Sequence, residues 1–145
     1  MLITIFGESC AGKSTLASAL KARTGAVVSS GKDYLRLAKS EGMAKALFQK
    51  QLKRAVEGGG ALIYVLAEPE LLSLVPEGGV RVLVTAELDE IKARFASRMG
   101  GALPPPVAAM LERKHGRFDQ IPHDVHVMAG RDDIRTVCEK ILSLS

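Results

Sequence analysis

Short apolar runs alternate along the whole chain with longer segments that have the spacing of amphipathic helices. Five runs, 2–6, 26–29, 61–66, 80–85 and 125–128, are predicted to be strands. A mostly apolar run is typical of a parallel strand that is covered on both faces. The segments predicted to be helical are 13–23, 34–39, 43–57, 69–74, 87–99, 107–115 and 132–144.

The alternation of strand and helix predicts one fold class. Strands that alternate with helices form parallel sheets, because each right-handed crossover returns the chain to the same edge. No internal repeat or linker divides the sequence. We therefore expect a single α/β domain over 1–145, a doubly wound five-stranded parallel sheet flanked by helices. Ligands of such folds bind at the carboxyl ends of the strands.

The composition is that of an ordinary globular protein, and it argues against several partners. Of the 145 residues only 4% are aromatic, too few for a base-stacking surface that would bind nucleic acid. No apolar run approaches the ~18 residues of a membrane span, and the first predicted strand leaves no room for a signal peptide. The two cysteines have no metal-ligand spacing and fit a reducing compartment. We expect a cytoplasmic monomer or weak homodimer without a nucleic-acid or membrane partner.

The segment after the first strand has the spacing of a phosphate-binding loop, the P-loop. It follows a predicted strand and leads into a predicted helix. Gly7 and Gly12 are expected to adopt backbone angles that turn the amide groups toward a phosphate, beside the positive end of the helix dipole. Lys13 can reach the β- and γ-phosphates of a nucleotide, and the Ser14 hydroxyl can ligate Mg²⁺. The residues expected to bind ATP here are Gly7, Glu8, Ser9, Cys10, Ala11, Gly12, Lys13, Ser14 and Thr15.

Two pairs of arginines flank a segment that is rich in glycine and proline. Arg94 and Arg98 are four residues apart on one predicted helix, and Arg113 and Arg117 repeat this spacing. Arginines stabilise the charge that spreads over a migrating phosphoryl group. The segment 100–106 between the pairs has the composition of a short lid that closes over a site. The alternative is that the four side chains form solvated helix faces.

Four segments together resemble the nucleoside monophosphate kinases, and the cytidylate kinase-like group is the most similar. They are the P-loop and residues 29–36, 82–98 and 110–119, and no Asn-Lys-x-Asp segment for guanine is present. The resemblance implies an enzyme, an ATP- and Mg²⁺-dependent kinase. Such a kinase moves the γ-phosphate to a small acceptor, and the resemblance favours a nucleotide or a nucleoside.

The same resemblance assigns roles to individual residues. Lys13, Arg94 and Arg98 would act on the migrating phosphate, and Arg94 and Gly130 would also contact ATP. Gly130 follows the last predicted strand, where related kinases place a backbone loop against adenine. The residues implied on the acceptor side are Gly31, Tyr34, Arg36, Arg113 and Arg117.

Two departures from this family leave the acceptor and the chemistry open. The third predicted strand lacks the acid that usually orients Mg²⁺, and Glu68 is the first candidate after it. The region between Arg36 and Ala61 is also short for an acceptor-binding insertion.

Asp33 offers a second interpretation. In kinases of small hydroxyl compounds, of the shikimate or antibiotic phosphotransferase type, a carboxylate after the second strand acts as a base or orients the hydroxyl. Asp33 could otherwise cap the helix that follows it. We expect Asp33 to be catalytic, to touch the acceptor, and to matter more than Glu68. The alternatives to a nucleotide kinase are therefore a hydroxyl kinase that uses Asp33, or a nucleotide-binding protein without catalysis.

Overall fold

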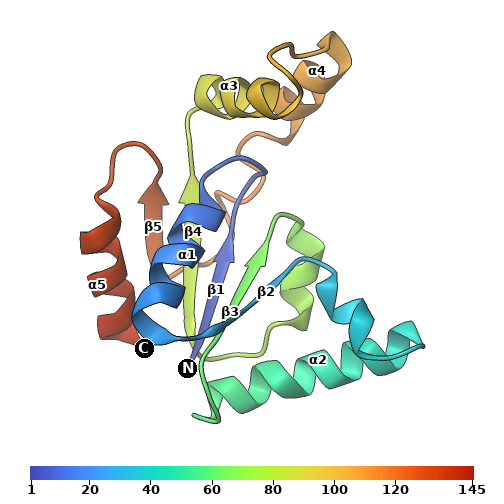
Figure 1. The fold of residues 1–145 in the computed structure, drawn as a ribbon, viewed down its shortest axis with the longest axis vertical. Helices are drawn as coiled ribbons and strands as arrows, with labels where there is room; N and C mark the ends of the chain where they lie inside the picture. The colour runs from blue at the N-terminus through green and yellow to red at the C-terminus, as the bar shows by residue number, and fades with distance from the viewer.

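Five parallel strands form one sheet, with β1 (Leu2–Phe6) at its centre. The computed structural model describes all 145 residues, and Figure 1 shows the strands running in one direction. The order across the sheet is β2-β3-β1-β4-β5. The other strands are β2 (Val27–Ser30), β3 (Leu62–Leu66), β4 (Val80–Thr85) and β5 (Val125–Met128). The predicted doubly wound parallel sheet is confirmed, and no predicted strand boundary is displaced by more than one residue.

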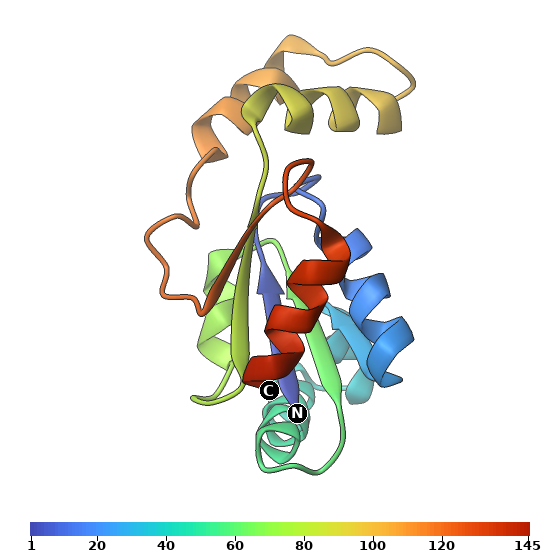
Figure 2. The same cartoon turned by 90° about the vertical axis from the view of Figure 1, so that its left-hand side faces the viewer.

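Helices cover both faces of the sheet and enclose two apolar cores. On one face α1 and α5 pack against each other, as Figure 2 shows, and they bury Leu16 and Ile141 in the first core. On the other face α2 and the short η2 bury Phe48 and Leu71 in the second core. The bounds are α1 (Lys13–Thr24), η1 (Asp33–Leu37), α2 (Glu41–Val56), η2 (Pro69–Leu74), α3 (Leu88–Arg98), α4 (Pro105–Lys114) and α5 (Ile134–Leu144). None of these helices has both the length and the apolar character that crossing a membrane requires.

Three predicted helix starts are wrong by two residues, each for a local reason. The helix predicted over 132–144 begins at Ile134, because the Asp133 carboxylate caps it by accepting a hydrogen bond from the backbone N–H of Thr136. The helix predicted over 43–57 begins at Glu41, because the Ser40 hydroxyl caps it by accepting a hydrogen bond from the backbone N–H of Met43. The helix predicted over 107–115 begins at Pro105, since proline suits the first turn of a helix, where its missing N–H is not needed. Residues 100–104 of the predicted lid segment 100–106 therefore remain a loop, and its last two residues belong to α4.

The helices α3 and α4 form a hairpin beyond the carboxyl ends of the strands, at the top of Figure 1. The P-loop leaves β1 beneath this hairpin. Phe6 at the end of β1 pairs with Leu66 in β3 and with Leu83 in β4. The P-loop is consequently surrounded by the ends of three strands and faces the helical hairpin.

Candidate functional site

The P-loop contains two residues with a left-handed backbone. Gly12, the N-cap of α1, has φ 107°, and Cys10 is the only residue other than glycine with a positive φ, at 64°. Left-handed residues other than glycine cluster at sites where the surrounding structure holds a loop for function. The Cys10 side chain is buried in the first core, which fits a packing role for this thiol.

Gly7 needs space rather than an unusual backbone angle. It has no positive φ, so the expectation from the sequence is wrong for this glycine and correct for Gly12. A Cβ atom on Gly7 would lie 2.1 Å from the carbonyl oxygen of Val84 in β4. The close approach of β4 therefore explains the glycine at this position.

Lys13 is folded back onto its own loop. Its Nζ donates hydrogen bonds to the carbonyl oxygens of Gly7 at 2.8 Å and Glu8 at 2.6 Å, and the residue is only 8% exposed. Burial lowers the pKa of Lys13 to about 8; Cys10 and Glu8 oppose this shift, and the positive charge of Arg98 adds to it. The ammonium has three N–H donors and uses two of them on its own loop, so one donor is left for a phosphate.

We expect ATP binding to weaken as the pH rises through the pKa of Lys13. The ammonium must be protonated to attract phosphate, and its pKa in the free protein is about 8. Above this pH the nucleotide must restore the proton, so the affinity should fall by about tenfold per pH unit. Calorimetry near pH 9 in two buffers of different ionisation enthalpy should detect uptake of nearly one proton per ATP. A binding enthalpy that does not depend on the buffer would contradict this expectation.

The largest cavity brings together three distant segments of the chain. It has a volume of about 610 Å³ and lies between the P-loop, helix α3 and the loop after β5. It is lined by Ser9, Cys10, Gly12, Lys13, Ser14, Thr15, Arg94, Arg98, Ala129, Gly130, Asp132 and Ile134. Most of the P-loop residues that the sequence predicts are there, together with Arg94, Arg98 and Gly130. The fold therefore assembles a basic cavity at the positive end of α1, which suits a phosphorylated ligand.

The two arginines of α3 differ in their partners. Arg94 donates a hydrogen bond from Nη1 to the carbonyl oxygen of Cys10 at 2.9 Å and lies 3.6 Å from the carboxylate of Glu90. Arg98 lines the same cavity without any hydrogen bond or ion pair, and its charge acts on Lys13. Arg94 therefore ties α3 to the P-loop, whereas Arg98 offers an unpaired guanidinium to a ligand.

The oxygen ligand available near the P-loop fits a magnesium ion that arrives with a nucleotide. Nowhere does the chain gather three His, Cys, Asp or Glu side chains that could hold a metal by themselves. Mg²⁺, however, is commonly held by one or two protein ligands together with substrate phosphates and water. The Ser14 hydroxyl is exposed in the large cavity and can provide one such ligand.

The predicted acceptor residues after β2 lie outside this cavity. The N–H of Gly31 donates to the carbonyl of Val65 at 2.8 Å, and its own carbonyl accepts a hydrogen bond from the hydroxyl of Tyr64 at 2.7 Å. Tyr34 is buried and stacks on Phe48 with ring centroids 5.2 Å apart, so its ring packs in the second core. Asp33 and Arg36 are exposed on η1. An acceptor role for these four residues stays a prediction.

A second cavity of about 230 Å³ lies between the P-loop, the end of β3 and helix α4. Ser9 lines both this cavity and the large one. The lining residues of the second cavity are Glu8, Ser9, Ala67, Glu68, Phe95, Met110, Leu111, Lys114 and Arg117. Arg117 is therefore placed beside the P-loop, whereas Arg113 is exposed on α4 and lines neither cavity.

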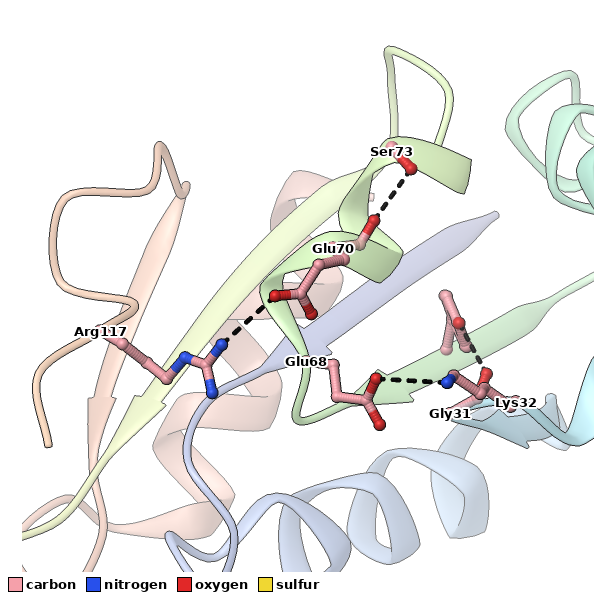
Figure 3. Close-up of polar contacts among 7 residues, drawn as sticks. Gly31, Lys32, Glu68, Glu70, Ser73 and Arg117 are labelled. Atoms are coloured by element: carbon pink, nitrogen blue, oxygen red, sulfur yellow. Dashed lines mark hydrogen bonds and ion pairs between the residues drawn. The ribbon is translucent and has the colours of Figure 1, made fainter. Parts of the chain in front are cut away.

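The charged residues of the second cavity are only partly paired. Figure 3 shows the Glu68 carboxylate turned toward Lys32, at 3.7 Å, and the Arg117 guanidinium turned toward Glu70, at 3.4 Å. Lys114 has no ion pair. Our interpretation of the sequence missed Lys114, although its place one turn before Arg117 on the same basic stretch could have indicated it.

Solved structures of kinases share this fold. A sugar kinase from Janibacter sp. is similar with a TM-score of 0.63 and 15% identity, over 99% of this chain and 92% of that one. A shikimate kinase from Acinetobacter baumannii in complex with shikimate has a TM-score of 0.62 and 14% identity, over 99% and 91%. A gluconokinase from Sinorhizobium meliloti has a TM-score of 0.58 and 14% identity, over 97% and 89%.

No protein-family model and no curated protein matches the sequence. At these identities the structural likenesses show a common fold. They confirm the resemblance to P-loop kinases at the level of the fold, but they do not single out the cytidylate kinase-like group.

Proposed function

We propose that this protein is an ATP-dependent phosphotransferase that moves the γ-phosphate of ATP to a hydroxyl group of a small molecule. The observation that carries the proposal is the large cavity, which gathers Lys13, Ser14 and the unpaired Arg98 around the P-loop. The second cavity adjoins it through Ser9, and an acceptor bound there would lie next to the phosphates. The kinases of similar fold support the same class of reaction.

The residues of the large cavity would have different roles in phosphoryl transfer. Lys13 and the amides of the P-loop would hold the β- and γ-phosphates, and Ser14 would bind Mg²⁺, which neutralises charge on the phosphate oxygens. Arg98 would stabilise the migrating phosphoryl group, because it has no other partner. Arg94 would hold helix α3 against the loop through the Cys10 carbonyl.

Two classes of acceptor are open, a nucleotide or nucleoside and a smaller hydroxyl compound. The second cavity has a volume of about 230 Å³, which is below the roughly 300 Å³ at which sites for drug-sized ligands begin. Lys114 and Arg117 on its wall could bind an acidic group, and the cavity also has an apolar wall. These features favour a small hydroxy acid. Two of the kinases of similar fold, a shikimate kinase and a gluconokinase, are named after compounds of that class.

A screen for acceptor-dependent ADP release tests this proposal. Purified protein with ATP and Mg²⁺ would be offered shikimate, gluconate, glycerol, cytidine and cytidine monophosphate. We expect the hydroxy acids to raise ADP release above the rate without acceptor. ADP release that only cytidine monophosphate stimulates would indicate that the acceptor is a nucleotide. ATP binding without ADP release for any compound would indicate a nucleotide-binding protein without catalysis.

Arg98 is expected to act on the transition state more than on ATP binding. Replacement by glutamine removes a charge that has no structural partner, so turnover should fall by about 10-fold or more while the Kd for ATP changes far less. Arg94→Gln is the matched comparison. Since Arg94 also holds the Cys10 carbonyl, this variant should weaken both binding and turnover. Equal fold losses in turnover and in ATP affinity for Arg98→Gln would mean that Arg98 only binds the nucleotide.

A further inference from the structure

Glu8, the second residue of the P-loop, lies between the second cavity and a third cavity. Its side chain is only 10% exposed. The third cavity has a volume of about 230 Å³ and lies against β4, β5 and the segment after α4. It is lined by Glu8, Leu83, Thr85, Ala86, Glu87, His115, Asp119, His123, His126 and Met128. All three histidines of the chain therefore line the third cavity, and none of them lines the second.

His115 holds the Glu8 carboxylate in place. Its Nδ1 lies 3.1 Å from Oε1 of Glu8, at the point where α4 ends. An ionised carboxylate can only accept, so the imidazole donates this hydrogen bond. Oε2 of Glu8 has no hydrogen-bond partner in the protein. One carboxylate oxygen is thus fixed by His115, and the other can accept a hydrogen bond from a ligand.

The other carboxylates near the P-loop are less suited to meet an acceptor. Glu68 is half exposed and pairs with Lys32, as Figure 3 shows. Asp33 lines neither the large nor the second cavity. Asp132 lines the large cavity, but one of its oxygens accepts a hydrogen bond from the backbone N–H of Met128 at 2.7 Å. Among these groups only Glu8 both has a mostly buried side chain and lies at the wall of the second cavity.

Glu8 is also close to the residues that bind phosphate. Its carbonyl oxygen accepts a hydrogen bond from Nζ of Lys13, and its charge raises the pKa of that lysine against the effect of burial. The next residue, Ser9, lines both the large and the second cavity. A hydroxyl group bound against Glu8 would therefore lie at the junction between the acceptor and the phosphates.

We propose that Glu8 is the catalytic residue that orients the acceptor hydroxyl and accepts its proton, and that His115 is the positioning residue that holds Glu8. The proposal rests on the proposed phosphotransferase function. In the transfer step, the acceptor oxygen forms a bond to the γ-phosphorus, and the bond from that phosphorus to the β–γ bridging oxygen breaks. The electron pair of the broken bond leaves with ADP. The hydroxyl proton moves to Oε2 of Glu8 and later to solvent.

The test compares Glu8→Gln with Asp33→Asn and Glu68→Gln. Glutamine has the shape of glutamate and can still accept the hydrogen bond from His115, but it cannot take a proton. With the acceptor of the screen that gives the fastest ADP release, Glu8→Gln should lower kcat by about 100-fold, in the range of general-base effects. Its Kd for ATP should stay within about threefold of the parent, and the loss of kcat in Asp33→Asn and in Glu68→Gln should be less than about 10-fold.

The role of His115 requires a readout other than a loss of activity. His115→Leu should lower kcat by about 10-fold with an unchanged Kd for ATP, whereas His115→Gln, which keeps a donor, should recover most of that loss. In the double variant Glu8→Gln/His115→Leu the loss should not exceed that of Glu8→Gln alone, because His115 acts through Glu8. Additive losses would assign His115 a separate, structural role and would overturn its part of the proposal.

The remaining outcomes separate this inference from the function on which it rests. If the parent protein releases ADP with an acceptor and Glu8→Gln keeps its rate, the inference alone is overturned. If Asp33→Asn loses activity and Glu8→Gln does not, Asp33 is the base, as the sequence indicates. If ATP binds but no compound of the screen releases ADP, the proposed function fails, and the role of Glu8 fails with it.

Discussion

Replacing Lys13 by methionine is expected to abolish tight ATP binding while the protein remains folded. Lys13 provides the only ammonium group in the large cavity. Each charge-assisted hydrogen bond contributes about 1.5–3 kcal/mol, so loss of the contacts to two phosphates should weaken binding by about 100-fold or more. Calorimetry with ATP and Mg²⁺ near pH 7 measures this change directly.

The effect of Lys13→Met on folding should be small because two contributions oppose each other. Methionine removes a charge whose burial lowers its pKa to about 8, and this favours the folded state. It also leaves the carbonyl oxygens of Gly7 and Glu8 without their donor, which costs stability. We expect the free energy of unfolding in urea to change by less than about 1 kcal/mol.

Lys50→Met on the exposed face of α2 is the matched control and should change neither ATP binding nor the free energy of unfolding. An ATP affinity of Lys13→Met within about threefold of the parent would place the phosphates elsewhere.

The grouping of the P-loop with Arg94 and Arg98 around one cavity could be predicted from the sequence because its determinants are local. The P-loop pattern spans a few consecutive residues, and the four-residue spacing of Arg94 and Arg98 places both on one face of a helix. The strand order then brings these segments together, since β1 and β4 are neighbours in the sheet. Short-range patterns combined with one topological rule were therefore sufficient for this part.

The second cavity, where we propose that the acceptor binds, could not be predicted in the same way, because it depends on contacts between distant residues. Glu8 and His115 are 107 positions apart, and nothing in either local sequence indicates their pairing. Tyr34 illustrates the same dependence on distant residues, and its acceptor role stays a prediction. It matches the acceptor segment of a related family, but its ring stacks on Phe48 in the second core. A side chain's neighbours in the fold decide such assignments, and a local motif does not contain them.

The case of Gly7 shows that even a well-recognised motif can hide the physical reason for a residue. The pattern requires glycine there, and the expected reason was a backbone angle. The structure instead places the Val84 carbonyl oxygen where a side chain would begin. Both residues lie at the ends of paired strands, β1 and β4, whose ladder runs through Ile3 to Phe6. The two strands cannot separate locally without breaking these hydrogen bonds.

Gly7→Ala should therefore destabilise the fold more than the same change at Gly12, the other glycine of the P-loop. A Cβ atom 2.1 Å from a backbone oxygen must displace β1 or β4, and strain of this kind costs about 3 kcal/mol or more. Urea unfolding followed by circular dichroism measures the loss.

Two control glycines separate steric overlap from the other effects of adding a methyl group. Gly42 in the first turn of α2 has open space and no positive φ, so Gly42→Ala should stabilise the protein by about 0.5 kcal/mol. Gly31 also has open space but φ +51°, so Gly31→Ala should cost about 1 kcal/mol from the backbone angle alone. If Gly7→Ala costs no more than Gly31→Ala, the P-loop can move away from β4. In that case the position of Glu8 and Ser9 at the wall of the second cavity would not depend on this contact.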